Sequence, residues 1–329
     1  AAHEDELPPQ FQHVDEDELA EKVREWELLA AQAKEAGTAP PDPPLNLKQR
    51  AVGQAVVPTL CTIRRQKRRF QGMGRNWRKE YAEWLRGEEK EGIKHQHLFL
   101  LSGAAGTGKT EVIKVLNNVL RDRNIGTLAL SAYTGAAVVQ LEDAVTLLTL
   151  LDLGINHPYE QRSLDPKLDQ KSIERFARYV NVDELVVLVI DECSFINATL
   201  LHHVDSRLRA LLQNNAPFGG LVVLLAGDFH QKPTTNGTAM HDALLEHNGV
   251  LMPNEKGEPE KKKKKKSKKK DFVLMSELGA EAKGLDMFAN FQRFSLKVTH
   301  RFKNDKTHGD NLHEMRNTKS SQPVTDAFL

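Results

Sequence analysis

A glycine-rich motif, Gly103–Thr110, constrains this chain more than any other feature of its sequence. It reads Gly-Ala-Ala-Gly-Thr-Gly-Lys-Thr, which is the G-x-x-x-x-G-K-T pattern of a phosphate-binding loop. The apolar residues 97–101 predict a buried strand before it, and apolar residues at helical spacing from Val112 to Leu120 predict a helix after it. The motif is therefore expected to join a strand to a helix, whose N-terminal N–H groups suit an anion.

The residue types of this motif also predict how it would hold a nucleotide. Glycines let the backbone turn toward phosphate oxygens, Lys109 brings a positive charge to the β- and γ-phosphates, and the Thr110 hydroxyl is placed to bind Mg²⁺. The residues expected to bind the nucleotide are Gly103, Gly106, Thr107, Gly108, Lys109 and Thr110. The sequence therefore predicts a site for a nucleotide with Mg²⁺.

Two further apolar runs end in polar residues, as parallel strands beside a ligand site do. Residues 185–190 are the most apolar run and lead into Asp191 and Glu192. Buried carboxylates are costly unless compensated, and Mg²⁺ on a nucleotide would compensate them. We expect Asp191 to hold the metal and Glu192 to take a proton from the attacking water. Residues 221–225 lead into a polar cluster, residues 227–233, expected at the same sheet edge.

Gln49 and the Thr134-Gly135 pair are weaker signals, each with an ordinary alternative. Gln49 lies at the start of a predicted helix, where its amide could hold adenine through two hydrogen bonds, but a glutamine there is also a common surface residue. Thr134 and Gly135 follow a predicted strand, residues 127–131, and could donate a hydroxyl and an N–H to a phosphate. An ordinary turn from strand to helix is the alternative.

The composition is that of a globular protein, with 40% hydrophobic residues, 28% charged residues and a formal net charge of +1. Cys61 and Cys193 form no disulfide framework, which indicates a reducing, intracellular setting. No run of 18 apolar residues is present, so we expect no membrane-spanning helix. His202 and His203 are adjacent on a predicted helix and point in different directions, so no metal site is expected there.

Taken together, these motifs resemble the petite-integration-frequency family of superfamily-one DNA helicases. The resemblance covers about residues 45–318, apart from residues 64–94 and 250–282. It implies an α/β fold, a RecA-like P-loop NTPase core with a mainly parallel sheet flanked by helices, and ATP and Mg²⁺ as cofactors. It also implies 5′-to-3′ movement on single-stranded DNA, duplex unwinding, and roles in DNA repair, recombination and telomere maintenance. The matching segments are residues 45–49, 103–110, 133–137, 190–192, 227–233 and 298–301.

The resemblance assigns roles to further residues. Gln231 would sense the γ-phosphate, and Arg301 would approach it as an arginine finger. Thr134, Gly135 and Phe229 would contact DNA. Partners would be single-stranded DNA and DNA junctions, without a membrane. The protein would act as a monomer, in the nucleus or mitochondrion if eukaryotic. The alternatives are a nucleic-acid-binding module that holds nucleotide without unwinding, and a P-loop ATPase acting on protein or RNA.

The chain also departs from the family pattern. Leu148 stands where the family places a histidine, and Lys232 and Thr234 stand where it has leucine and proline. Nothing after Arg301 resembles the later motifs of a second RecA-like lobe. We therefore expect an amino-terminal portion of a helicase with the second lobe largely absent. By itself it should show weak ATPase activity and no strand separation.

We divide the chain into four parts. Residues 1–44 are an acidic amino-terminal helix and a proline-rich linker: residues 1–14 are expected to be disordered, and Asp15 to Ala36 to form a helix packed on the core, or one that binds a partner. Residues 45–240 form the first lobe. Residues 241–282 are a low-complexity insertion with nine lysines between positions 261 and 270, and residues 283–329 are the arginine-finger segment that begins the second lobe.

The insertion at residues 64–94 combines basic and aromatic side chains and permits two interpretations. Basic side chains between aromatic ones suit a nucleic-acid backbone with stacked bases. An exposed helical insertion whose aromatic residues pack on the core would have the same pattern, and both interpretations stay open. The lysine run 261–270 is expected to be disordered and could raise nucleic-acid affinity or act as a nuclear address.

Overall fold

A six-stranded parallel sheet lies at the centre of the protein in a computed structural model that describes residues 6–91, 97–139, 141, 143–153, 170–229, 240 and 271–298. The order across the sheet is β3-β2-β4-β5-β1-β6, and every neighbouring pair is parallel. The predicted α/β class with a mainly parallel sheet is confirmed. The strands are β1 (Leu98–Gly103), β2 (Thr127–Ala132), β3 (Val145–Thr146), β4 (Leu185–Asp191), β5 (Val222–Gly227) and β6 (Gln292–Leu296).

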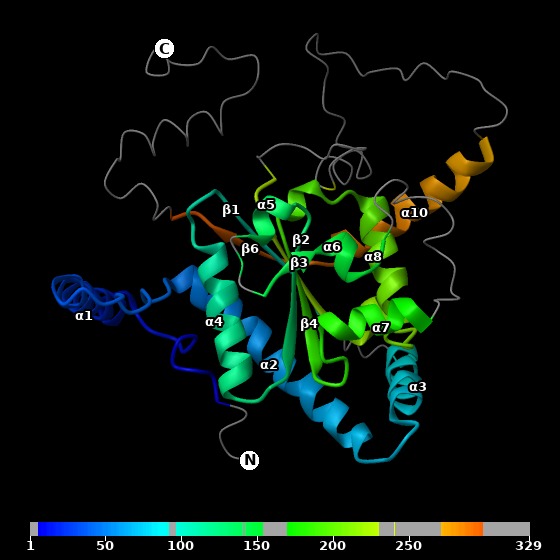
Figure 1. The fold of residues 1–329 in the computed structure, drawn as a ribbon, viewed down its shortest axis with the longest axis horizontal. Helices are drawn as coiled ribbons and strands as arrows, with labels where there is room; N and C mark the ends of the chain where they lie inside the picture. Colours follow the sequence, from blue (N-terminus) through cyan, green and yellow to red (C-terminus); the bar gives the residue numbers. More distant parts are fainter. Residues whose placement is uncertain are drawn as a thin grey trace, which may run out of the picture.

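Helices cover both faces of this sheet (Figure 1). α2 (Leu47–Gln71) and α4 (Lys109–Asp122) pack on one face; α6 (Leu147–Leu150), α7 (Gln170–Tyr179), α8 (Ala198–Leu211) and α10 (Asp271–Ala289) pack on the other. α5 (Gly135–Val138) follows β2, and short 3₁₀ turns span Cys193–Phe195 and Pro217–Gly220. Leu98 and Leu100 of β1 join one core while Phe99 and Leu101 join the other, which explains the uninterrupted apolar run. Within the described ranges, no helix is long and apolar enough to cross a membrane.

Residues 6–14 pack against α2, so the expectation that residues 1–14 are disordered is wrong for them. Phe11 is fully buried, and a Cβ added to Gly53 would lie 1.9 Å from its ring. The Arg50 guanidinium donates hydrogen bonds to the carbonyl oxygens of Pro9 (3.0 Å) and Gln12 (3.1 Å). The glycine at position 53 makes room for Phe11, and this contact between distant parts of the chain has no local sequence signal.

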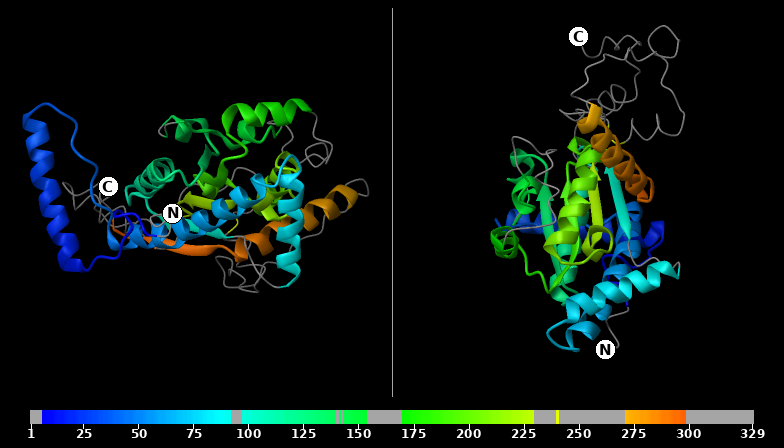
Figure 2. Two further views of the ribbon diagram at one scale, coloured as in Figure 1. Left: turned by 90° about the horizontal axis from the view of Figure 1, so that it is seen from below. Right: turned by 90° about the vertical axis from the view of Figure 1, so that its right-hand side faces the viewer.

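α1 (Glu16–Glu35) has the predicted limits but not the predicted packing. The Asp15 carboxylate accepts a hydrogen bond from the backbone N–H of Glu18 (2.8 Å), and Gly37 follows the helix with a φ of 68°. None of the helix's residues is buried, so α1 is not packed on the core as expected. Figure 2 shows it standing away from the sheet.

Two of the basic residues that begin at position 64, Arg64 and Lys67, pack at the edge of the sheet where β4 begins. α2 continues unbroken through them to Gln71. The buried Lys67 ammonium donates a hydrogen bond to the carbonyl oxygen of Leu185 (2.7 Å), and buried Arg64 pairs with Glu184. These two charges are therefore engaged within the protein, at the opposite edge from the phosphate loop.

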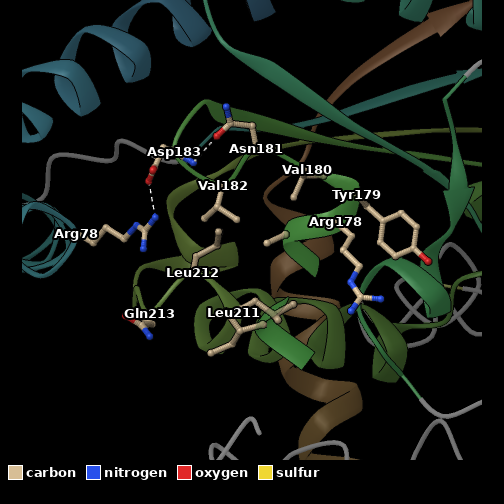
Figure 3. Close-up of a pocket in the computed structure, with 12 residues that line it drawn as sticks. Arg78, Arg178, Tyr179, Val180, Asn181, Val182, Asp183, Leu211, Leu212 and Gln213 are labelled. Atoms are coloured by element: carbon tan, nitrogen blue, oxygen red, sulfur yellow. Dashed lines mark hydrogen bonds and ion pairs between the residues drawn. The ribbon is translucent and has the colours of Figure 1, made fainter. Parts of the chain in front are cut away.

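The aromatic residues of the same stretch form a small core of their own between α2 and α3 (Trp77–Lys90). The ring centroids of Phe70 and Tyr81 lie 5.5 Å apart, and those of Phe70 and Trp84 lie 5.6 Å apart. Nearby, Arg78 pairs with Asp183 beside a cavity of about 580 Å³ (Figure 3). Of the two interpretations of residues 64–94, the packing of these rings favours the helical insertion whose aromatic residues are buried.

Residues 271–296 add a helix and a strand to the same lobe. α10 packs along α8, and β6 pairs with β1 so that Leu296 lies opposite Gly103. The sequence predicted an insertion at residues 241–282 and the start of a second lobe at residue 283, whereas residues 292–296 belong to the first sheet. The lysine run 261–270 and residues 299–329 lie outside the described residues.

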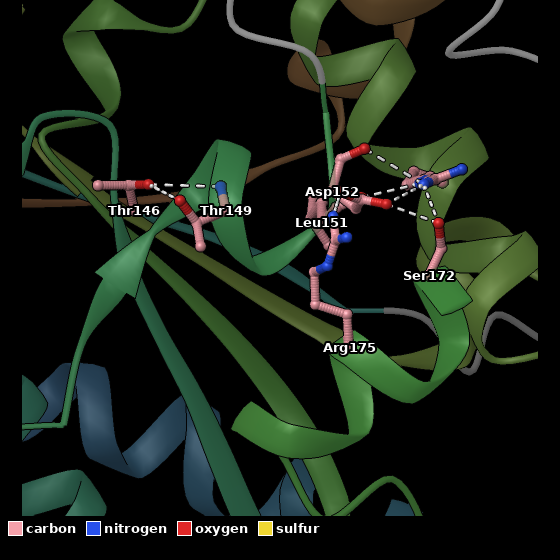
Figure 4. Close-up of polar contacts among 7 residues, drawn as sticks. Thr146, Thr149, Leu151, Asp152, Ser172 and Arg175 are labelled. Atoms are coloured by element: carbon pink, nitrogen blue, oxygen red, sulfur yellow. Dashed lines mark hydrogen bonds and ion pairs between the residues drawn. The ribbon is translucent and has the colours of Figure 1, made fainter. Parts of the chain in front are cut away.

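Asp152 joins α6 to two neighbouring helices (Figure 4). Its carboxylate accepts hydrogen bonds from the Ser172 hydroxyl (2.6 Å) and from Arg175, both on α7. The buried Arg207 of α8 donates to the carbonyl oxygens of Leu151 (2.8 Å) and Asp152 (3.2 Å). These bonds fix the end of α6, which carries Leu148, against α7 and α8.

Phe11→Ala should lower the free energy of unfolding by about 3–5 kcal/mol, because it leaves a cavity against α2. Leu28→Ala is the matched control: Leu28 is 63% exposed on α1, so its truncation should change the free energy of unfolding by less than about 0.5 kcal/mol. Urea denaturation followed by circular dichroism measures both variants. Equal stability of the two would contradict the burial of residue 11.

Candidate functional site

Within the described residues, the predicted site residues lie at or beside the edge of the sheet where β1, β2, β4 and β5 end. Ser102 of β1 lies opposite Gly227 of β5, and Ala132 of β2 lies opposite Asp191 of β4. Because all four strands are parallel, the segments that follow them leave the sheet side by side. The phosphate loop, Asp191 and Glu192, and Asp228 follow three of these strands, and the Thr134-Gly135 pair follows the fourth.

The phosphate loop has the backbone that its glycines predict. Gly106 has a φ of 80° and Gly108 a φ of 82°, values that favour glycine. Thr107 between them is fully buried, and its hydroxyl donates to the carbonyl oxygen of Ala104 (2.8 Å). The Lys109 ammonium donates to the carbonyl oxygens of Gly103 (2.8 Å) and Ala104 (3.2 Å). The lysine side chain is therefore held over the loop, where the β- and γ-phosphates of a nucleotide are predicted to bind.

Gln49 is buried and supports the phosphate loop. Its amide oxygen accepts from the backbone N–H of Asn46 (2.8 Å), which completes a capping box at the start of α2. Its amide nitrogen donates to the carbonyl oxygen of Thr107 (3.1 Å). A Cβ added to Gly108 would lie 2.2 Å from that nitrogen, so glycine is required there for space as well as for φ. Each end of this amide already has one protein partner. Its predicted contact with adenine stays a proposal.

Three carboxylates lie close enough to Lys109 for their charges to act on it, so negative charge exceeds positive charge among these four side chains. Burial lowers the pKa of Lys109, and the charges of Asp191, Asp228 and Glu192 oppose that shift. Burial raises the pKa of Asp191, although its carboxylate accepts a hydrogen bond from the backbone N–H of Glu192 (2.9 Å). Burial also raises the pKa of Glu192, and the charge of Asp191 adds to it. An additional cation would lower the cost of this arrangement.

These donors fit Mg²⁺ held together with a nucleotide. Mg²⁺ prefers hard oxygen ligands and usually takes only one or two from the protein, with phosphates and waters supplying the rest. The Thr110 hydroxyl and the Asp191 carboxylate are such oxygens. No group of three or more His, Cys, Asp or Glu side chains suited to a metal ion occurs in the part of the chain that the structure describes.

Asp228 belongs to the polar cluster predicted at residues 227–233, but the sequence assigned it no role of its own. It is 4% exposed, and its charge acts on both Lys109 and Glu192. Its position directly after β5, the neighbour of β1, was the available signal. Glu192 carries a second feature that the sequence did not predict: its φ of 53° is unusual for a residue other than glycine and redirects the chain after Asp191.

The residues predicted to contact DNA lie at the same edge but are less tightly grouped. The Thr134 hydroxyl accepts from the backbone N–H of Ala137 (3.3 Å) and caps α5, while Gly135 is exposed with open space around its Cα. The Phe229 ring is half-buried and packs edge-on against Phe288 of α10, with ring centroids 5.8 Å apart. Gln231 and Arg301, which are predicted to act at the γ-phosphate, lie outside the described residues.

Comparison with known proteins agrees with these motifs. Residues 89–245 match the family model of the PIF1-like helicases. The ATP-dependent DNA helicase Pif1 of a Psychrobacter species is 35% identical over 133 residues, which are 40% of this chain and 19% of that protein. The human ATP-dependent DNA helicase PIF1 is 33% identical over 147 residues, 44% of this chain and 21% of that protein. The chain thus spans about a fifth of the length of these relatives.

A crystal structure of Pif1 helicase from Candida albicans aligns with a TM-score of 0.46 and 24% identity, over 74% of this chain and 44% of that one. The family model covers the phosphate loop, Asp191-Glu192 and Asp228 within one stretch of the chain. Through residues 89–245, this chain is similar to the PIF1-like helicases.

Proposed function

We propose that this chain carries the first motor lobe of an ATP-dependent DNA helicase, which couples ATP hydrolysis to 5′-to-3′ movement on single-stranded DNA and to duplex unwinding. One observation carries the proposal: a phosphate loop and three buried or half-buried carboxylates meet at one sheet edge around Lys109. The names of the relatives, ATP-dependent DNA helicases, support this class of reaction. Roles in DNA repair, recombination and telomere maintenance belong to the same proposal.

Each residue of the edge has a proposed task. Lys109 offsets charge on the β- and γ-phosphates, and its present hydrogen bonds to loop carbonyl oxygens keep it in reach of them. Thr110 and Asp191 would hold Mg²⁺, which neutralises phosphate charge when it is bound with ATP. Glu192 would accept the proton of the attacking water. Asp228 would orient Lys109 through its charge.

The roles of the remaining predicted residues rest on the family resemblance. Gln231 is proposed to sense the γ-phosphate and Arg301 to approach it as an arginine finger. Thr134, Gly135 and Phe229 are proposed to contact single-stranded DNA or the strands of a junction. We propose a monomer, located in the nucleus or mitochondrion if the source is eukaryotic.

Lys109→Ala and Glu192→Gln should separate nucleotide binding from hydrolysis. The first variant removes the charge that faces the phosphates and should weaken ATP binding and lower turnover by about 10²-fold or more. The second keeps the shape but removes the base, so ATP should still bind while turnover falls by about 10²–10⁴-fold. Lys114→Ala, an exposed lysine paired with Glu111 on the same helix, is the control.

Calorimetry with ATP and a phosphate-release assay measure the two effects. The assignment fails if Lys109→Ala binds ATP as the parent protein does. Glu192 is not the base if Glu192→Gln turns over at the parent rate.

Gly135→Ala tests the proposed DNA contact without disturbing the fold. The added methyl group meets no heavy atom within 4 Å, so the protein should stay as stable as the parent. If a phosphate of the DNA lies against Gly135, affinity for single-stranded DNA should fall about three- to tenfold. Gly87→Ala, which also meets no atom but lies on α3 at the opposite edge, should bind as the parent does. Equal affinities of both variants in a fluorescence-anisotropy titration would remove Gly135 from the DNA interface.

A further inference from the structure

α1 and the proline-rich linker form one wall of a cavity beside the phosphate loop. The cavity has a volume of about 500 Å³, which is large enough for the base and ribose of a nucleotide. The loop side is formed by Gly106, Gly108, Lys109 and Thr110. The opposite side is apolar, and the residues that form it are Val23, Trp26, Pro43, Pro44 and Leu45.

The orientation of Trp26 is fixed by its polar atom. The indole N–H donates to the carbonyl oxygen of Pro41 (2.7 Å), which ties α1 to the linker. Val23 and Trp26 are half-buried on the side of α1 that faces the cavity, whereas Leu28 and Leu29 are 63% and 53% exposed. With its N–H satisfied, the ring has only its apolar surface to offer to whatever occupies the cavity.

The apolar wall offers a base a kind of contact that Gln49, which lines the same cavity, does not. The amide of Gln49 is 4% exposed and already bonds to Asn46 and to Thr107 of the loop. These bonds leave one N–H and one lone pair of the amide for a base edge, but an amide gives no stacking surface of aromatic size. Stacking on an aromatic ring, in contrast, accepts any base because every base has a π-face.

We propose that Trp26 stacks on the base of the nucleotide whose phosphates lie on Gly103–Thr110, with Val23 and Pro44 as further apolar contacts. This inference rests on the proposed nucleotide site and adds α1 to it. A larger base offers more area for stacking on Trp26. Purine nucleotides should therefore bind more tightly than pyrimidine nucleotides, and ATP and GTP should differ little. Binding would bury the half-exposed side of α1, which has no fully buried residue to hold it otherwise.

Calorimetric titration of the full chain with Mg-ATP, Mg-GTP, Mg-CTP and Mg-tripolyphosphate tests the inference. Trp26→Ala should weaken ATP and GTP binding about tenfold or more and leave tripolyphosphate binding unchanged, because tripolyphosphate lacks a base. Trp26→Phe should retain most of the ATP affinity. Leu28→Ala, on the exposed side of α1, should bind every ligand as the parent does. The melting temperature of Trp26→Ala should equal that of the parent, since no core contact is lost.

The outcomes separate this inference from the proposed function. If the parent binds neither ATP nor tripolyphosphate, the nucleotide site itself is overturned, and the inference with it. If both bind and Trp26→Ala leaves ATP affinity unchanged, only the role of Trp26 is overturned. If Trp26→Ala weakens tripolyphosphate and ATP equally, Trp26 supports the loop and does not stack on the base, which also overturns the inference.

Discussion

Parallel pairing of the buried strands is the constraint on which the rest of this structure depends. β4 and β5 are buried along their whole length, and both faces of the sheet are covered by helices, so the strands cannot slip or reverse without exposing apolar side chains. Parallel strands end at the same edge. The segment with Lys109 follows β1, Asp191 and Glu192 lie at the end of β4, and Asp228 follows β5, so this geometry brings their charges together. The cost of burying these charges is what a nucleotide with Mg²⁺ would offset.

Helix α2 connects this edge to the rest of the chain. Its first turn supports the loop, because Gln49 links Asn46 to Thr107. The next residue, Arg50, and Gly53 one turn further on hold residues 6–14 against the same helix. Its last turns anchor the far edge through the hydrogen bond from Lys67 to Leu185. A single helix therefore couples the amino-terminal segment, the phosphate loop and the start of β4.

The parts of the structure that could be predicted are those with local signals. The apolar run 185–190, the phosphate loop and the cap at Asp15 each specify their own conformation, and the structure contains all three. The unpredicted parts depend on contacts between distant positions. The burial of Phe11 requires space at Gly53, and Arg64 of the basic stretch forms an ion pair with Glu184. Residues 292–296 pair with β1 at the edge of the sheet. The sequence does not predict that Trp26 lies beside the phosphate loop, because the proline-rich linker between them determines their separation.

Hydrogen exchange of backbone amides, with and without a non-hydrolysable ATP analogue and Mg²⁺, shows whether nucleotide binds at this edge of the sheet. We expect protection on binding to be concentrated in residues 103–110, 191–192 and 227–228, together with α1 and the linker, which form the other wall of the cavity. The far edge, around Arg78 and Asp183, should exchange as before. Protection confined to that far edge, or an unchanged phosphate loop in the presence of saturating analogue, would contradict the account.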